Sequence, residues 1–166
     1  MGAIQNAFNQ MLATTAGALA ANEVVKGQRQ QNKLNALNTS QDLIDQRFNN
    51  EVDLKSAKNE RKEANANLRS AKKGKDEAGQ NIANIEDKFN SGKVENMSGL
   101  IKEYGRNIGA FQAYKMKVEE VQGTKKGIRD RIKMLEQKAS NIDEKIDVHN
   151  KTLKKLKLPQ IEGRDE

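Results

Sequence analysis

The side chains with an evident binding chemistry are two groups of lysine and arginine in the last third of the sequence. The first group is Lys125, Lys126, Arg129, Arg131 and Lys133, and the second is Lys151, Lys154, Lys155 and Lys157. Such cations bind the phosphates of a polyanion with salt-dependent affinity and without sequence choice. No aromatic side chains are interleaved with them for base stacking. Contact with DNA would therefore be nonspecific, and the pattern favours a solvated helix face as the interpretation of both groups.

Residue types that support catalysis or metal binding are sparse. His149 is the only histidine and the chain has no cysteine, which excludes disulfides and thiolate metal sites. The acidic neighbours Glu119 and Glu120 point to different faces of a helix. The pair Gly105 and Gly109 lacks the following lysine of a phosphate-binding loop. We predict a protein that is not an enzyme and has no catalytic, metal or cofactor site.

The composition indicates which elements must position these residues. Of the 166 residues 35% are hydrophobic and 32% are charged, there is one proline, and the net charge is +7. A long helical pair fits this composition because only a narrow stripe on each helix needs to be apolar. No stretch shows the sustained alternation of a strand. The sequence predicts an all-α fold whose positive charge favours polyanionic neighbours.

Two apolar seams mirror each other around a turn. One descends from Phe89 toward Leu34 and the other rises from Val94 to Leu156, both in steps of three and four residues. We predict a first long helix over residues 24–90, a turn over 91–93, a second long helix over 94–158 and a polar tail over 159–166. Together they form a long antiparallel helical hairpin of coiled-coil type. A parallel bundle of several chains is the alternative.

The mirrored seams also predict a register. In it Ala78 faces Tyr104 and Ala71 faces Phe111, so that small residues meet bulky ones across the seam. Phe48 and Ile101 lie on the two seams, and each seam has a local break in its seven-residue phase, near Glu51 and Val121.

Residues 1–23 form a separate zone with hardly any charge, and we predict an amphipathic helix that docks on a membrane or on a protein partner. Its apolar face and its small-residue spacing are carried by Ile4, Phe8, Met11, Leu12, Ala13, Gly17, Leu19 and Ala21. Small residues four apart let helices approach closely in membranes. A helix that binds anionic lipid usually shows lysine or arginine on its polar face, and none occurs before Lys26. Both the membrane and the protein partner stay open.

The order of parts resembles a group of bacteriophage virion proteins. An uncharged segment beginning MGAIQNAF is followed by the joint KGQRQQNKLNALN and then by a long helical region rich in lysine and asparagine. This layout is similar to that of the DNA pilot proteins of microviruses and the internal ejection proteins of tailed phages. The resemblance implies self-association through the helices, contact with other virion proteins, and an N-terminal segment that engages the host membrane.

These observations lead to three functional hypotheses. The first is a noncatalytic helical phage virion protein, packaged in the particle or associated with its portal or tail, that assists genome delivery across the host envelope. The second is a cytoplasmic coiled-coil scaffold or adaptor, and the third is a nonspecific DNA-binding protein. Salt-dependent binding to DNA would favour the third hypothesis over the second.

Overall fold

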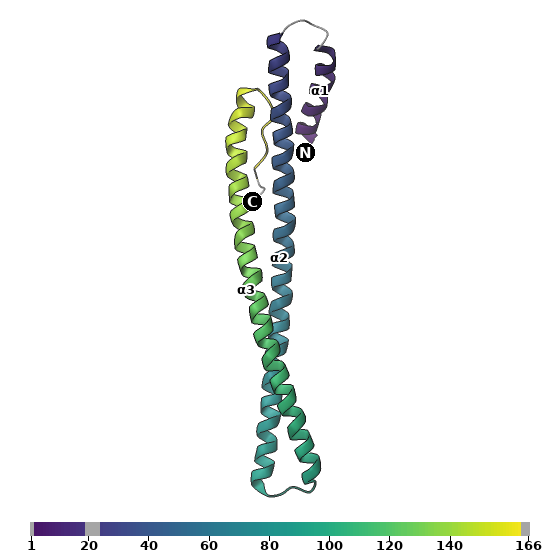
Figure 1. Ribbon diagram of the computed structural model, residues 1–166, viewed down its shortest axis with the longest axis vertical. Helices are drawn as coiled ribbons and strands as arrows, with labels where there is room; N and C mark the ends of the chain where they lie inside the picture. Colours follow the sequence, from purple (N-terminus) through teal and green to yellow (C-terminus); the bar gives the residue numbers. More distant parts are fainter. Residues whose placement is uncertain (1, 19–23, 164–166) are drawn as a thin grey trace. The chain divides into compact units, whose positions relative to one another are not determined.

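The computed structural model describes residues 2–18 and 24–163, and within them the side chains of residues 2–11 and 25–163. It contains three helices in this order: α1 (Gly2–Ala18), α2 (Val24–Ser91) and α3 (Met97–Lys155). The described residues include no strand, so the all-α prediction is confirmed. Figure 1 shows the three helices and the turn that joins α2 to α3.

The chain divides into two units, each made of segments from both long helices. The terminal unit comprises residues Met1–Leu54 and Met134–Glu166, and the turn unit comprises Lys55–Lys133. In both units α3 runs back along α2. In the turn unit Glu86 meets Tyr104 and Glu60 meets Arg131, and in the terminal unit Ser40 meets His149.

The terminal unit contains a cluster of branched aliphatic side chains. Its buried members are Ile4 from α1, Ala36, Leu37 and Leu43 from α2, Ile142, Ile146 and Leu153 from α3, and Ile161 from the C-terminal segment. Each fully buried leucine or isoleucine contributes about 1.5–3 kcal/mol of transfer free energy. Two polar side chains, Ser40 and Asn50, are also fully buried. Ser40 lies 2.9 Å from Nε2 of His149, and Asn50 donates to the carbonyl of Leu135.

The turn unit has a thinner core. On α2 its buried residues are Ala57, Ala64 and Ala71, then Ala78 and Ile85, each seven residues from the next. On α3 they include Val118, Val121, Ile128 and Ile132. Alanines at this spacing allow the two backbones to approach closely. At Gly74 a β-carbon would lie 2.5 Å from the Tyr114 ring. The ring therefore lies directly on the α2 backbone.

The connection between the long helices is longer than the sequence predicted. α2 ends at Ser91 and not at residue 90, and Gly92 adopts the left-handed conformation (φ 69°) that commonly follows a helix end. α3 begins at Met97 and not at residue 94. The reason is that the Asn96 side chain caps α3 by accepting a hydrogen bond from the Gly99 amide at 2.9 Å.

This later start of α3 shifts the register, and the predicted pairing of Ala78 with Tyr104 and Ala71 with Phe111 is wrong. The Tyr104 ring packs edge-on against Phe89, with centroids 6.1 Å apart, and Phe89 lies about three turns along α2 from Ala78. Phe111 lies beside Gly79 and beneath the ammonium of Lys75, which is 5.9 Å from the ring centre.

The predicted phase breaks are also absent. Every seventh residue of α2 from Leu43 to Ile85 is buried, whereas Phe48 is 56% exposed. On α3 Leu100 is buried and Ile101 is 57% exposed. The seven-residue repeat passes through polar Asn50, whose side-chain amide donates to the Leu135 carbonyl on α3. Ser40, three residues before Leu43, is also buried, with His149 of α3 as a partner. Apolarity alone therefore indicated the wrong residues.

α3 ends at Lys155, three residues before the predicted end. Lys157 has a positive φ of 57°, and the amide of Leu158 donates to the carbonyl of Leu153 at 2.9 Å. The amide of Lys157 donates to the carbonyl of Lys154 at 3.1 Å. This pair of bonds is the Schellman arrangement, which closes a helix before any proline is reached. Pro159 follows outside the helix.

Candidate functional site: a basic face on the turn unit

One edge of the seam in the turn unit is occupied by an ion pair between the two helices. Arg131 Nη1 on α3 lies 3.0 Å from Glu60 Oε1 on α2. Both side chains are half exposed, so the pair contributes little to stability. The ion pair shows which flank of each helix lies on this edge of the seam.

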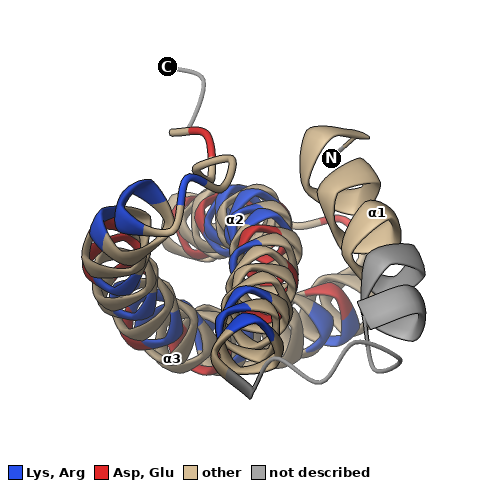
Figure 2. Ribbon diagram, turned by 90° about the horizontal axis from the view of Figure 1, so that it is seen from above, with Lys and Arg blue, Asp and Glu red and all other residues tan. Residues whose placement is uncertain are grey.

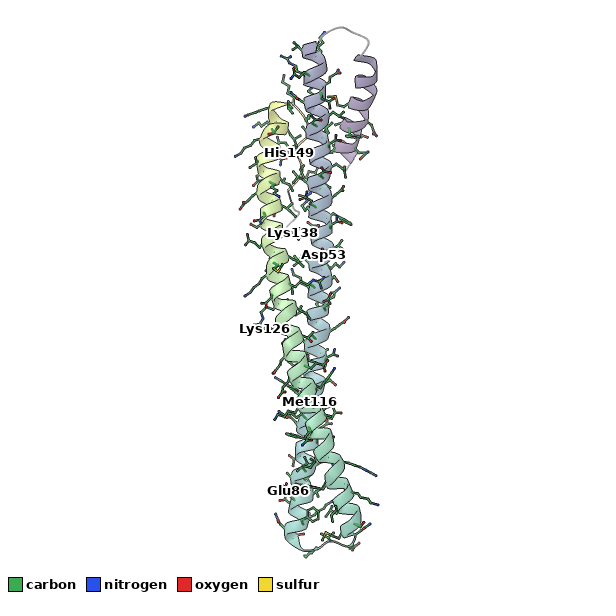
Figure 3. All side chains as sticks on the ribbon, in the orientation of Figure 1. Asp53, Glu86, Met116, Lys126, Lys138 and His149 are labelled. Atoms are coloured by element: carbon green, nitrogen blue, oxygen red, sulfur yellow. The ribbon has the colours of Figure 1, made fainter. Side chains whose placement is uncertain are left out.

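The opposite edge of the same seam is lined by cations. Lys58 and Arg129 each precede a member of the ion pair by two residues, which is about 200° around a helix. Further cations follow Lys58 and Arg129 at steps of three, four and seven residues, which keeps them on that side. We call this set the basic face: Lys55, Lys58, Lys62, Arg69 and Lys72 on α2, with Lys126, Arg129 and Lys133 on α3. All of these side chains are exposed, and Lys126 is labelled in Figure 3.

The acids of this region lie largely elsewhere. By the same helical geometry Glu60 and Glu63 point to the other flank of α2. Asp130 borders the basic face on α3. Closer to the turn, the acidic residues Asp76 and Glu119 lie on the flank that carries the cations, and the basic face ends there. Over this stretch the cations outnumber the acids, and the local charge is strongly positive.

The first predicted group of cations is thus divided by the structure. Lys126, Arg129 and Lys133 lie on the basic face, and Lys125 is half-buried beside them. Arg131 does not belong to it, because its guanidinium pairs with Glu60 on the other edge. A residue two positions along a helix is on the opposite side, which a linear cluster does not reveal.

The second predicted group surrounds the C-terminal end of α3 in the terminal unit. Lys151, Lys154, Lys155 and Lys157 are all exposed. Lys154 and Lys155 stand in the last turn, where positive charge interacts favourably with the helix dipole. Their placement therefore has a structural explanation within the helix itself.

The α2 half of the basic face was missed by the sequence reasoning. Along the chain its cations alternate with Glu60 and Glu63, and this interspersion indicated a solvated exterior. The pattern that identifies it is that positive and negative side chains lie on different flanks of the helix. Lys55, Lys58 and Lys62 share one flank, and the two acids share another.

The N-terminal docking residues are partly used within the chain. Ile4 is buried in the core of the terminal unit, and Phe8 and Met11 pack against the same core. Leu12, Ala13 and Gly17 belong to α1 but their side chains are outside the described set, and Leu19 and Ala21 lie outside the described residues. Figure 2 shows that the described part of α1 carries no charged residue. Its described apolar face therefore packs against α2 and the core of the terminal unit.

His149 lies between α2 and α3 in the terminal unit, where Figure 3 labels it. Its Nε2 atom is 2.9 Å from the Ser40 hydroxyl and 3.0 Å from the Ala36 carbonyl, while Ser40 Oγ donates to the same carbonyl at 3.0 Å. Ser40 is fully buried, so a substrate has no access to its hydroxyl. The pair is a polar contact between helices.

No group of three or more histidine, cysteine or acidic residues is placed to hold a metal ion within the described part of the chain. None of the described helices combines the length and apolarity that a membrane span requires.

Comparison of the chain with protein-family models, with curated proteins and with solved structures found no match.

Proposed function

We propose that this protein is a noncatalytic helical phage virion protein that contacts the genome through the basic face and assists its delivery across the host envelope. The observation that carries the proposal is the separation of charge in the turn unit, where exposed cations from two helices share one edge of the seam. Such a face suits the regularly spaced phosphates of a nucleic acid. The layout of the chain supports the virion assignment by resemblance only.

The proposal includes the architecture of the long helices. α2 and α3 form an antiparallel coiled coil, in which the basic face and the Glu60–Arg131 pair flank opposite edges of one seam. The buried residues of α2 at seven-residue spacing support this arrangement. So do the alternating steps between Val118, Val121, half-buried Lys125 and Ile128 on α3.

The binding mode follows from the residue types on the face. Lysine and arginine bind phosphates as cations, and the face itself contains no aromatic side chain on which a base could stack. The protein therefore binds duplex DNA through the backbone, without sequence choice and with strong salt dependence. Self-association in the particle would place several such faces along one nucleic acid.

Titration of duplex DNA at two salt concentrations tests the proposal. The face variant carries Lys58→Gln, Lys62→Gln, Lys126→Gln and Arg129→Gln. The control variant carries the same loss of charge in the same unit, through Lys88→Gln, Lys93→Gln, Lys102→Gln and Arg106→Gln. Loss of four phosphate contacts should reduce the slope of log K against log[salt] by about 3–4 for the face variant alone. Equal weakening of both variants would show that net charge, and not the face, drives binding.

A cytoplasmic scaffold is the second candidate, and one observation favours it. A groove of about 620 Å³ opens in the terminal unit, lined by Thr39 and Leu43 of α2 and by Val148 and Thr152 among its α3 residues. Val148 is 65% exposed there. A helix of a partner protein could occupy such a groove. Absence of binding both to duplex DNA and to phospholipid vesicles would favour this candidate.

A further inference from the structure

The C-terminal segment that follows α3 is fastened to the terminal unit by specific hydrogen bonds. The Asn150 side chain donates to the Ile161 carbonyl at 3.0 Å and accepts from the Ile161 amide at 2.8 Å. Arg47 Nη1 donates to the Glu162 carbonyl at 2.8 Å. Ile161 is 3% exposed and belongs to the apolar cluster of this unit. The segment is therefore bound as an extended peptide is bound, with two backbone contacts to one amide side chain.

α1 is seated on the same unit by apolar burial. Ile4 is its one buried residue among the described side chains, and Phe8 and Met11 are half-buried. A pocket of about 370 Å³ is lined by Ile4 and Phe8 of α1 and by residues of α2 that include Leu37 and Gln41. A helix seated beside unfilled space loses dispersion contacts that a close fit would provide. Its docked state is consequently weaker than that of the helices of the seam.

The C-terminal segment forms part of the seat of α1. A second cavity, of about 170 Å³, is lined by Ala3 and Ile4 of α1, by Ile44 and Arg47 of α2 and by Gln160 and Ile161 of the segment. Ile4 and Ile161 also belong to one apolar cluster. Figure 1 shows both α1 and the segment beside the first part of α2. Removing the segment would expose Ile4 and widen this cavity to solvent.

We propose that residues 159–162 act as a latch that holds α1 in its docked position. With the latch bound, the face formed by Ile4, Phe8 and Met11 is packed against α2 and the core of the terminal unit. When the latch is released, α1 loses one wall of its seat and undocks, and its uncharged apolar face becomes available to a lipid surface. Binding of the two segments is coupled, and thermodynamic linkage requires the coupling to be reciprocal.

Amide hydrogen exchange of the full chain tests the latch. The variant Ile161→Asp places a charge in the buried position, and Val148→Asp introduces the same charge at an exposed aliphatic residue of the same unit as the matched control. We expect exchange in residues 2–18 to become about tenfold faster in Ile161→Asp, within the usual range of coupling between sites. Exchange in the turn unit should be unchanged and serves as the internal reference. The control should match the parent protein.

A second variant removes the hydrogen-bond clamp without adding a charge. Asn150→Ala deletes both contacts to Ile161 and should raise exchange in residues 2–18 in the same direction. Deletion of residues 2–18 should accelerate exchange at the Ile161 amide by the same factor, because the coupling is reciprocal. Faster exchange at Ile161 with unaltered exchange in α1 would overturn the latch.

The outcome for membranes rests on the proposed function and is measured separately. Dye-loaded vesicles of phosphatidylcholine are mixed with the parent protein, with Ile161→Asp and with Ile161→Asp lacking residues 1–22. We expect leakage from Ile161→Asp that exceeds the parent and disappears with the deletion. Faster exchange without leakage would keep the latch and remove the membrane role. Leakage without faster exchange would overturn the latch.

Discussion

The terminal unit and the turn unit use the same helix pair but fill its seam differently. In the terminal unit Leu37 and Leu43 from α2 meet Ile146 and Leu153 from α3 in one cluster. In the turn unit α2 contributes alanines at every seventh position from Ala57 to Ala78. An alanine buries far less apolar area than a leucine, so the turn unit gains less free energy per layer.

This difference means that one unit packs the additional segments of the chain and the other carries the basic face. The terminal unit gathers α1, the C-terminal segment and two long helices around a substantial core, and it fastens them with Asn150 and Arg47. The turn unit buries little, and its surface is free to carry the basic face. Stability and docking are thus concentrated where the aliphatic side chains are, and charge is displayed where alanines let the helices lie close together.

The largest expected effect is in the terminal unit. Leu153→Ala removes a fully buried side chain from the aliphatic cluster and should lower the free energy of unfolding by about 2–5 kcal/mol. Urea denaturation followed by circular dichroism measures it. Met134→Ala, at a 73% exposed position of the same helix, should change stability by less than about 0.5 kcal/mol. Similar losses in the two variants would contradict the placement of this core.

An intermediate effect is expected from enlarging an alanine of the turn unit. Ala71→Leu forces extra volume between closely spaced helices and should cost about 1–3 kcal/mol, although leucine is the more apolar residue. Thermal unfolding compares it with Ala66→Leu, which enlarges an exposed alanine on the same helix. A stabilised Ala71→Leu variant would mean that the seam has room, and that close approach does not explain the alanine repeat.

The smallest effect concerns the turn end of the same unit. The Tyr104 hydroxyl donates to Glu86 Oε1 at 3.1 Å, and this bond, with the carboxylate charge, raises the pKa of Tyr104 above its ordinary value of 10.0. Because the folded pKa is raised, the contribution to stability is present below the unfolded pKa and is lost as pH rises through the folded pKa. Glu86→Gln should lower the pKa of Tyr104.

Ultraviolet absorbance during alkaline titration measures this change. The chain has two tyrosines, so Tyr114→Phe is introduced into both proteins to leave a single tyrosine signal. An unchanged midpoint after Glu86→Gln would show that the contact across the turn unit does not persist in solution.

Much of the fold could be predicted from the sequence because periodicity and helix ends are local properties. The all-helical class, the long helices and the turn at Gly92 follow from apolar spacing and from the conformational freedom of glycine. The separate N-terminal helix follows from its uncharged composition. The expectation that Phe8 and Met11 form a docking face was also local, although their partner proved to be the same chain.

What the sequence by itself determined was therefore the presence and approximate length of each helix. Only the tertiary structure decided which residues meet. Capping by Asn96 moved the start of α3, and the contacts across the seam differ from the predicted ones, because Phe111 lies beside Gly79 and not beside Ala71. Burial of Ser40 and Asn50 depended on partners more than eighty residues away. The same distant contacts decided that Asn50 is buried and the nearby Phe48 is exposed. The basic face likewise depends on tertiary structure. Its cations on α2 and α3 are far apart in the sequence, and they become neighbours only because the two helices pack against each other.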